Sequence, residues 1–401
     1  MAAKRILTSR ATQNMIVADD VYTSDDKLVI PEGTVLTEDI IDSLKEYGVF
    51  AIRIKVDDDG NNAAAENEKV TPAGDEALNE QRQEIKNSAE QEHESFLKQV
   101  KESKEFEVFH SAFVDSVDNL KNVFSKVVMH NEQIDGESIL SDVENVVSKG
   151  RNSIHILDML QCMRGYDDVT YVHSVNVALL SNMIGRIVYP DISDEELKVL
   201  TLAGLLHDIG KMMVPDNIIQ KKGRLTLPEY NLVKTHVLFG NNILKGIDNL
   251  DPRIAEVAMR HHERCDGTGY PGGYKREQIE PFARIVAIAD TYDAMTSDRA
   301  YRAAICPFDV IEMFEREGIV KYDVAFLLPF LEKAVQAYMN TDVRLSTNQI
   351  GKVIMINKNE FSKPVVQVGD EFYDLSKETN DIVIDRQCNI LSLSHIKNKL
   401  V

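Results

Sequence analysis

Five of the ten histidines and two aspartates are concentrated in one part of the 401-residue chain. These residues are His173, His207, Asp208, His236, His261, His262 and Asp290. Imidazole and carboxylate ligands together suit Fe or Mn, and less specifically Zn, Co or Ni. Any one of these histidines, taken singly, is more often a hydrogen-bonded core residue than a metal ligand. The five histidines and two aspartates taken together predict a centre of two divalent metal ions.

The most informative motif is His207-Asp208-Ile209-Gly210-Lys211, at the end of an apolar helix that begins near Ser193. Adjacent residues on a helix diverge by about 100°, so His207 and Asp208 can reach neighbouring points of one cavity, while Lys211 shares the face of His207. A buried, ionised aspartate is costly unless it is paired or bound to a metal. Considered alone, the two adjacent residues are explained equally well as a hydrogen-bonded core pair.

A glycine-rich loop begins at His261-His262 and ends at Gly273. Glycines such as Gly269 allow the backbone to approach a ligand closely, and Tyr270-Pro271 supplies a semi-rigid aromatic element. Because the loop leaves a helix directly at two candidate ligands, we expect it to face a substrate. The alternative is an ordinary glycine-rich turn.

Arg299 and Arg302 follow Asp290 and share one face if this segment is helical, which suits a phosphate clamp. The alternative is two surface arginines without a ligand. The chain has 45 Lys and Arg against 65 Asp and Glu, a formal net charge of −20. This charge repels polyanions and argues against a nucleic-acid polymer as partner, whereas local cations still permit a small anionic substrate.

Hydrophobic periodicity predicts a mainly α protein with a mixed module at one end and a β-rich part at the other. The predicted division is an α/β module at 1–56, an acidic linker at 57–87, a helical platform at 88–149, an all-helical domain at 150–340 and a β-rich subdomain at 341–401. Ser193 and the Thr226–Glu229 pair are predicted helix caps. Strands are predicted at 351–356, 364–368 and 381–384. The apolar stripes near 106–128 and 136–163 indicate internal packing or, alternatively, a homodimer surface.

The four cysteines are scattered without a CxxC pair. This spacing excludes a cysteine-rich structural zinc site and indicates reduced thiols. The N-terminus lacks the apolar core of a signal peptide, and no run of about 18 apolar residues occurs. We therefore expect a cytoplasmic protein without a membrane span.

Three ordered strings resemble the HD-GYP family, bacterial members of the HD phosphohydrolase superfamily. They are HDIGK at 207–211, HHERCDGTGYP at 261–271 and IADTYDAMTSDRAYR at 288–302. The resemblance covers about residues 150–320 and implies an all-helical HD-type catalytic domain that hydrolyses cyclic di-GMP. It implies that the seven histidines and aspartates above are metal ligands. It also places Lys211, Arg299 and Arg302 at substrate phosphate, and Gly269, Tyr270 and Pro271 in the loop that names the family.

The resemblance further implies two metal ions, Fe or Mn, and a metal-bridged hydroxide that attacks phosphorus, with Asp208 and Lys211 in the catalytic machinery. The expected product is pGpG, followed by GMP in a slower step. Family members with a third metal carry glutamate four residues before the first histidine, where this chain has Val169. We therefore expect two metals, with Asp167 or Asp168 as the alternative ligands of a third.

Two other functions are compatible with the same motifs. A weakly active cyclic di-GMP receptor would be favoured by the loss of a metal ligand, and the motifs retain all seven. A phosphodiesterase for another nucleotide, such as hybrid cyclic GMP-AMP, would share the metal centre and differ in the surrounding contacts.

Overall fold

The structure is a computed structural model, and the chain forms two compact units, Met1–Glu90 and Gln91–Val401. The described residues are 2–8, 11–19, 21–22, 28–31, 33–37, 40–41, 44, 51–56, 96–130, 132–163, 169–221, 223–297, 305–377 and 382–384. The predicted linker at 57–87 lies outside these residues.

The first unit contains two small antiparallel sheets. The pairs are β1 (Ala2–Leu7) with β4 (Ala51–Val56), and β2 (Val21–Tyr22) with β3 (Leu28–Ile30). Thr37 begins a helical turn, because its hydroxyl accepts a hydrogen bond from the backbone N of Ile40 at 3.4 Å. Leu44 and Val17 are fully buried in the core of this unit. The mixed α/β character predicted for this segment is therefore present.

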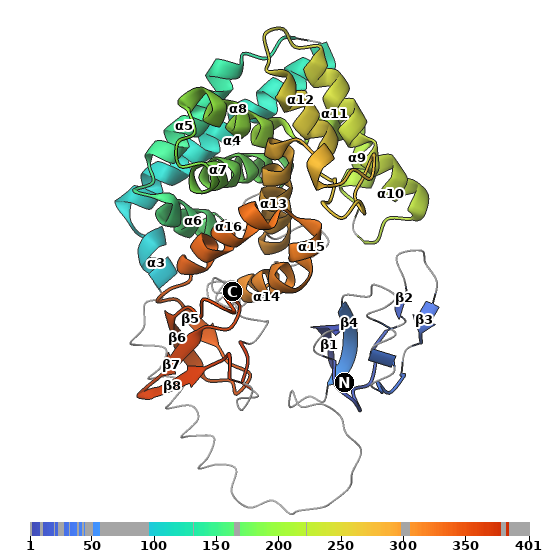
Figure 1. Cartoon of the computed structure of the whole chain (residues 1–401), viewed down its shortest axis with the longest axis vertical. Coiled ribbons are helices and arrows are strands. Elements are labelled where there is room, and N and C mark those ends of the chain that lie inside the picture. The colour runs from blue at the N-terminus through green and yellow to red at the C-terminus, as the bar shows by residue number, and fades with distance from the viewer. Residues whose placement is uncertain are drawn as a thin grey trace, which may run out of the picture. The chain divides into compact units, whose positions relative to one another are not determined.

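The second unit is mainly helical and ends in a small sheet (Figure 1). Its first helices are α3 (Phe96–Lys101), α4 (Lys104–His130), α5 (Gly136–Ser148), α6 (Ser153–Cys162), α7 (Val169–Val188) and α8 (Asp194–Leu206). Then follow η2 (Ile209–Met213), α9 (Asp216–Ile219), α10 (Leu227–Lys234), α11 (His236–Lys245), α12 (Pro252–Arg260), η3 (Arg276–Gln278) and α13 (Pro281–Thr296). The last are α14 (Pro307–Met313), the π-helical turn η4 (Phe314–Gly318), α15 (Ile319–Lys321) and α16 (Val324–Gln336). No helix among the described residues combines the length and the apolar character needed to cross a bilayer.

Side-chain caps set the starts of two helices near the candidate site. Ser193 caps α8 by accepting a hydrogen bond from the backbone N of Glu196 at 3.2 Å. Thr226 and Glu229 form a reciprocal capping box at the start of α10. Such caps satisfy backbone N–H groups that the first helical turn leaves unpaired. Both caps predicted from the sequence are confirmed.

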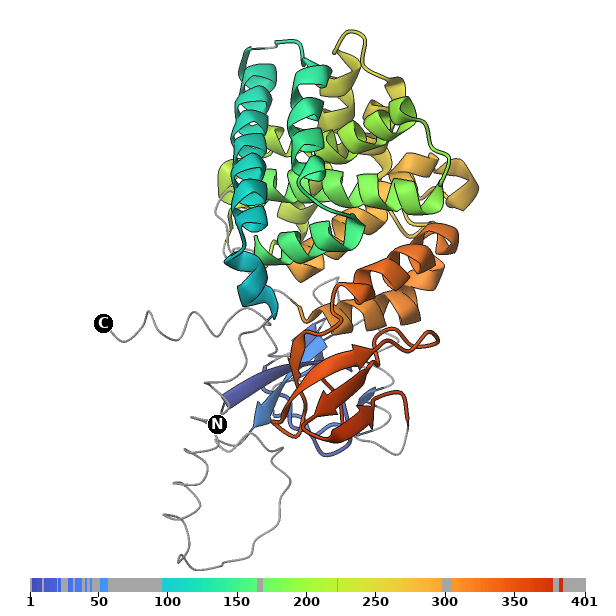
Figure 2. The ribbon, with the colours of Figure 1, turned by 90° about the vertical axis from the view of Figure 1, so that its left-hand side faces the viewer.

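Helices α4 and α5 pack against each other and against α7, and Figure 2 shows α4 and α5 side by side. The apolar stripe of α4 is buried, with Phe109, Phe113 and Phe124 fully inaccessible to solvent. These residues belong to the same hydrophobic core as α7 and α8. Internal packing thus accounts for this stripe.

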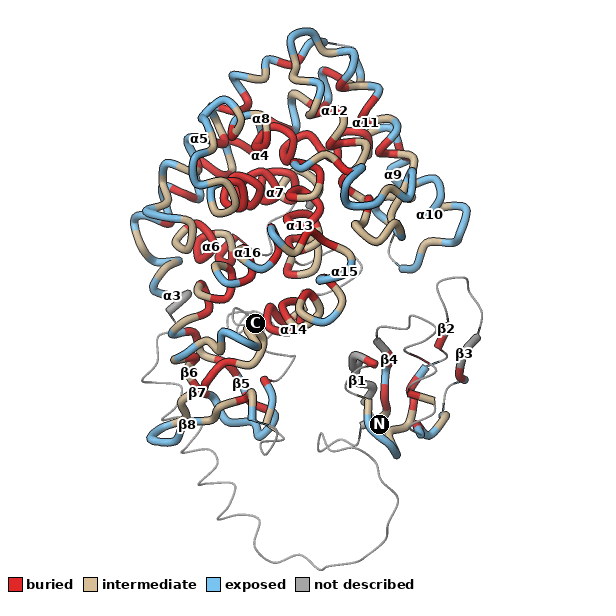
Figure 3. Tube along the Cα trace, in the orientation of Figure 1, coloured by how far each residue is buried: buried red, intermediate tan, exposed pale blue. Residues whose placement is uncertain are grey.

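The centre of the helical unit is formed by α7, α8 and α13, which are mostly buried (Figure 3). Gly204 of α8 allows a close approach to α7. A Cβ atom at this position would lie 3.1 Å from both the carbonyl oxygen of Val177 and the Cα of Ala178. The two helices that carry His173 and His207 are therefore held together backbone to backbone.

The chain continues into an antiparallel sheet with the strand order β5-β6-β7-β8. Its strands are β5 (Asp342–Arg344), β6 (Ile350–Met355), β7 (Val365–Val368) and β8 (Glu371–Asp374). β6 and β7 correspond to two predicted strands. Near the third predicted strand, Ile384 forms an isolated bridge with Leu345. β5 and β8 were missed because they are short strands at the sheet's edges with few buried side chains.

Candidate metal centre

The seven predicted ligands come together at one end of the α7–α8 pair, drawn from five helices. Three of them lie at helix ends, because His207 is the C-cap of α8, His236 begins α11 and His261 is the C-cap of α12. His262 and Asp208 each follow one of these end residues in the chain. His173 and Asp290 come from within α7 and α13.

Asp208 lies between two sets of histidines. Its Oδ2 atom is 3.3 Å from Nε2 of His207 and 3.8 Å from Nε2 of His173. Its Oδ1 atom is 3.3 Å from Nε2 of His236 and 3.8 Å from Nε2 of His261. The two carboxylate oxygens therefore face different imidazoles, which is the arrangement required of a carboxylate shared by two metal ions.

Asp290 makes a second link across the cluster. Its Oδ1 atom lies 3.0 Å from Nε2 of His173, and its Oδ2 atom lies 3.8 Å from Nδ1 of His262. Two groups of donor atoms are close enough to hold an ion. One consists of His173, His207 and Asp208, and the other of Asp208, His236, His261 and His262.

Backbone carbonyls fix the tautomers of three of these histidines. Nδ1 of His207 donates a hydrogen bond to the carbonyl oxygen of Gly204 at 2.7 Å. Nδ1 of His236 donates one to the carbonyl oxygen of Val233, also at 2.7 Å. Nδ1 of His261 likewise donates to the carbonyl oxygen of Ala258 at 3.0 Å. A neutral imidazole whose Nδ1 carries the proton presents a lone pair at Nε2, the form that binds a metal.

Within the part of the chain that the structure describes, no side chain donates a hydrogen bond to Nε2 of His207. Nε2 of His236 and Nε2 of His261 are only 3.4 Å apart, although both are acceptors when each Nδ1 donates to the backbone. Among the described residues, Nε2 of His207 and Oδ1 of Asp208 are buried without a hydrogen-bond partner. Unpaired buried polar atoms are costly, and cations between them would remove that cost. The donor set therefore fits divalent metal ions.

The charges of the cluster suit the same role. Burial alone would raise the pKa of Asp208, but the ammonium group of Lys211 holds it well below its usual value. Burial lowers the pKa values of His261 and His262 well below the ordinary value, so both imidazoles are neutral. Lys211 donates a hydrogen bond to Oδ2 of Asp208 and keeps part of its side chain accessible. Its ammonium group is thus placed at the edge of the cluster.

Asp293 is a functional candidate that the sequence analysis missed. Its Oδ2 atom accepts a hydrogen bond from Nδ1 of His173 at 2.6 Å, and Nδ2 of Asn176 donates to its Oδ1 atom at 2.8 Å. A carboxylate behind a histidine orients the ring and increases its basicity as a ligand. The signal was available, because Asp293 lies one helical turn after Asp290 on α13.

The glycine-rich loop is held against the cluster by a second missed residue, Glu263. This buried carboxylate accepts hydrogen bonds from the backbone N of Gly272 at 2.6 Å and of Tyr274 at 3.0 Å. A Cβ atom at Gly269 would overlap with the backbone of Glu263, so the close approach requires glycine there. Tyr270, followed by Pro271, stacks its ring on the imidazole of His262, with 4.7 Å between the centroids.

Four other residues considered in the sequence lie outside the described residues. They are Arg299, Arg302, Asp167 and Asp168. Val169, which occupies the position of the third-metal glutamate, is the first residue of α7.

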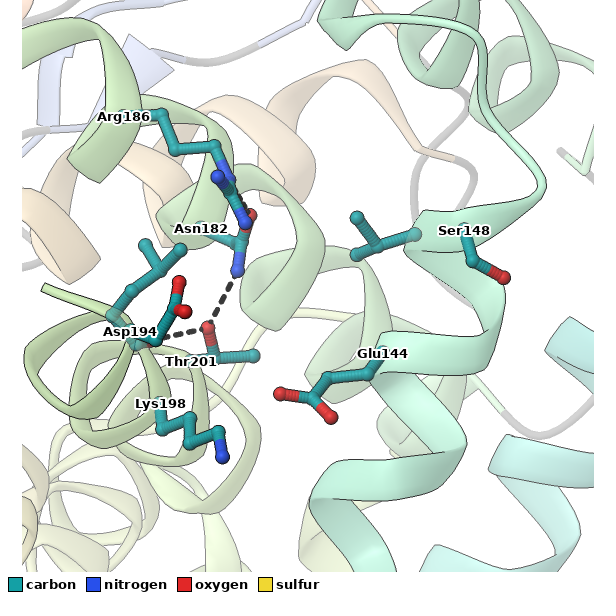
Figure 4. A pocket seen from close by; sticks show the side chains of 9 residues that line it. Glu144, Ser148, Asn182, Arg186, Asp194, Lys198 and Thr201 are labelled. Carbon is teal, nitrogen blue, oxygen red and sulfur yellow. Dashed lines mark hydrogen bonds between the residues drawn. The ribbon is translucent and has the colours of Figure 1, made fainter. Parts of the chain in front are cut away.

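A hollow of about 380 Å³ lies elsewhere, between α5, α7 and α8 (Figure 4). Its polar groups partly satisfy one another, because Nε of Arg186 donates to Asn182 and Nδ2 of Asn182 donates to Thr201. No predicted site residue lines this hollow. It is separate from the candidate metal centre.

The HD domain family matches residues 153–326 of the chain. This match covers less than half of the chain and places an HD domain within the second unit. The match agrees with the resemblance noted in the sequence, and the mainly α fold predicted there is confirmed. An HD domain implies binding of divalent metals, in agreement with the histidine–aspartate cluster.

Several curated proteins are similar to parts of this chain. Cyclic di-GMP phosphodiesterase PA4108 of Pseudomonas aeruginosa is 40% identical over 204 residues, 50% of this chain and 48% of that protein. Cyclic di-GMP phosphodiesterase response regulator RpfG of Xanthomonas campestris is 45% identical over 114 residues, 28% of this chain and 30% of that protein. The 3'3'-cGAMP-specific phosphodiesterase 3 of Vibrio cholerae is 39% identical over 137 residues, 34% of this chain and 29% of that protein. The chain therefore spans about half the length of the first relative and under a third of the other two.

Proposed function

We propose that this protein is a metal-dependent phosphodiesterase that hydrolyses cyclic di-GMP to pGpG, with GMP as the product of a further step. The observation that carries the proposal is the position of Asp208, whose two carboxylate oxygens face separate sets of histidines. Relatives named as cyclic di-GMP phosphodiesterases support the choice of substrate.

The proposed ligands divide between two metal ions, Fe or Mn. His173, His207, Asp208 and Asp290 would hold one ion, and Asp208, His236, His261 and His262 would hold the other. Nitrogen and oxygen donors without thiolates favour these metals. When bound, the ions supply Lewis acidity and lower the pKa of water, so that hydroxide is available to attack phosphorus at neutral pH.

The chain's own residues would position the substrate and offset its charge. Lys211 can transfer its hydrogen bond from Asp208 to a phosphoryl oxygen and stabilise the charge that grows there. Arg299 and Arg302 are proposed as further phosphate contacts, on their sequence motif alone. Gly269, Tyr270 and Pro271 would form the wall of the site beside His262.

A phosphodiesterase for hybrid cyclic GMP-AMP is the second candidate, because the relative from Vibrio cholerae carries that specificity in its name. The two substrates differ in one purine base, whereas the proposed metal ligands meet the phosphates. The rates at which the protein hydrolyses the two cyclic dinucleotides, measured at equal concentrations, distinguish the candidates. The chain retains all seven proposed metal ligands, which disfavours a weakly active receptor that binds cyclic di-GMP without hydrolysing it.

The deciding experiment is hydrolysis of cyclic di-GMP by the full chain, purified without oxygen and loaded with Fe or Mn, with products separated by chromatography. We expect pGpG to form only with metal, and to be lost in a chelated sample and in Asp208→Ala. Asp194→Ala, which changes an exposed aspartate in the first turn of α8, is the matched control. Full turnover in Asp208→Ala at unchanged metal content would refute the proposal.

The arrangement of the whole chain is also proposed from the sequence. We propose the boundaries at 56, 87, 149 and 340, a cytoplasmic location and a homodimer formed through the helical region. Exposed Val108 and Met129 on α4 support a second contact face on that helix. Light scattering of the full chain, compared with a Val108→Lys/Met129→Lys double variant, tests the dimer.

A further inference from the structure

Helix α10 presents a lysine between two aromatic rings next to the candidate metal centre. Nζ of Lys234 lies 4.5 Å from the ring centroid of Tyr230, on the same helix, and 5.0 Å from that of Tyr270, in the glycine-rich loop. Both distances are within the range of a cation–π contact. Lys234 thus joins α10 to the loop.

These contacts continue to a proposed metal ligand, because the ring of Tyr270 stacks on His262 with 24° between the ring planes. The result is a series of four side chains in contact, which we call the α10 stack. Its members are His262, Tyr270, Lys234 and Tyr230. The stack runs from the metal centre to the surface, where Tyr230 is 44% exposed.

Packing of the protein itself does not explain why Tyr230 is placed there. No residue of α10 is buried, so the helix contributes little to the hydrophobic core. The capping box nevertheless holds the start of the helix firmly, and Nζ of Lys221 donates to Oε1 of Glu229 at 2.9 Å. The residue after Glu229 is Tyr230, so its ring is presented from a well-defined helical turn rather than a loose loop.

The chemistry of the stack suits a nucleobase. Exposed aromatic rings bind bases by stacking, and neighbouring cations attract the phosphates of the same nucleotide. In a chain of net charge −20, Lys234 together with Lys211 places positive charge beside this one site. A nucleotide whose phosphate lies at the metal centre could direct its base outward along the stack.

We propose that Tyr230 is a base-binding residue, on which a purine of the substrate stacks, and that Lys234 positions its ring next to Tyr270. This inference rests on the proposed function in one respect, that the phosphate of a nucleotide binds at the metal centre. It adds a residue outside the HD and GYP motifs as a determinant of base recognition. Tyr230 contacts the base, and the metal ligands contact the phosphate.

The test compares two ligands that share a sugar phosphate and differ in the base. Calorimetry of the metal-loaded full chain measures the affinities of GMP and ribose 5-phosphate. We expect Tyr230→Leu to weaken GMP binding about 10-fold and to leave ribose 5-phosphate binding unchanged. Lys234→Met should weaken both ligands through the lost charge and GMP more strongly, because the ring of Tyr230 also loses its support.

Two control variants isolate the aromatic ring. Tyr230→Phe keeps the ring and should bind GMP like the unmodified protein. Leu232→Ala changes another exposed side chain of α10 and should alter neither affinity. Metal content, measured in every variant, should remain the same.

Two results would overturn the assignment: equal weakening of both ligands in Tyr230→Leu, or no change in either. The assay measures binding and needs no turnover, so it separates this inference from the proposed reaction. If Tyr230→Leu selectively loses affinity for GMP while the unmodified protein fails to hydrolyse cyclic di-GMP, the base site would be retained and the phosphodiesterase refuted. If instead the unmodified protein hydrolyses cyclic di-GMP and Tyr230→Leu weakens GMP and ribose 5-phosphate equally, the phosphodiesterase would be retained and the base site refuted.

Discussion

At the scale of single residues, the candidate site depends on how donor and acceptor atoms are paired. Backbone carbonyls occupy Nδ1 of His207, His236 and His261, which leaves Nε2 of each to face Asp208. Asp208 divides its oxygens between two groups of imidazoles. Removal of a histidine from one group should therefore differ from removal of the shared carboxylate.

This difference predicts the metal stoichiometry of two variants. His236→Ala removes a ligand from one proposed ion only, so we expect about one metal ion per chain in place of two. Asp208→Ala affects both ions and should leave less than one. Metal analysis of protein dialysed against a weak chelator makes the comparison, with circular dichroism to verify the fold. Equal losses in the two variants would contradict a bridging role for Asp208.

Glu263 predicts a stability effect in the glycine-rich loop. In Glu263→Gln the amide side chain has one acceptor oxygen where the carboxylate has two. The backbone N–H of either Gly272 or Tyr274 would therefore lose its buried partner. We expect the free energy of unfolding of Glu263→Gln to fall by about 1–3 kcal/mol, as measured by thermal or chemical unfolding. Hydrogen exchange at residues 266–275 should become faster. Glu277→Gln, at an exposed position of η3, should show neither effect.

At the scale of elements, the site depends on how closely the turn after α8 approaches α11. A Cβ atom at Gly210 of η2 would overlap with the carbonyl oxygen of His236 and the backbone N of Gly240. Because these neighbours are backbone atoms, they cannot move aside without displacing the helix. Gly210 thereby sets the distance between the His207–Asp208 pair and the first residue of α11.

Gly210→Ala should consequently weaken both stability and metal binding. Overpacking of this kind costs about 1–3 kcal/mol, and here it also pushes His236 away from Asp208. Thermal unfolding and metal content measure the two effects. Gly136→Ala, where the nearest atom to a new Cβ is at an ordinary 3.6 Å, is the control. A variant with normal unfolding and full metal content would contradict the proposed role of this contact.

At the scale of the whole molecule, stability should depend on a buried carboxyl group that the proposed mechanism does not use. Asp158 of α6 is 7% exposed, and its Oδ1 atom has no hydrogen-bond partner within the described part of the chain. Burial raises the pKa of Asp158 from 3.8 to about 7. Between these values the folded protein binds more protons than the unfolded chain, so stability falls as the pH rises.

We therefore expect Asp158→Asn to be more stable than the unmodified protein by about 4 kcal/mol at about pH 8, and similar to it at about pH 4. Urea unfolding at the two pH values measures the difference. Asp115→Asn, which alters an exposed aspartate of α4, provides the comparison. A difference that does not depend on pH would show that the charge of Asp158 is not its source.

The sequence by itself determined the ligand types, the HD and GYP motifs and the caps at Ser193 and Thr226. These features depend on residues close together in the chain, where spacing and propensity suffice. The partnership of His173 with Asp293, the division of the oxygens of Asp208 and the contact of Lys234 with Tyr270 were decided by the tertiary structure. The reason is that each joins segments separated by many residues, whose approach is set by the packing of the helical unit. Spacing along a helix fixes a face, but only packing decides which other side chain meets that face.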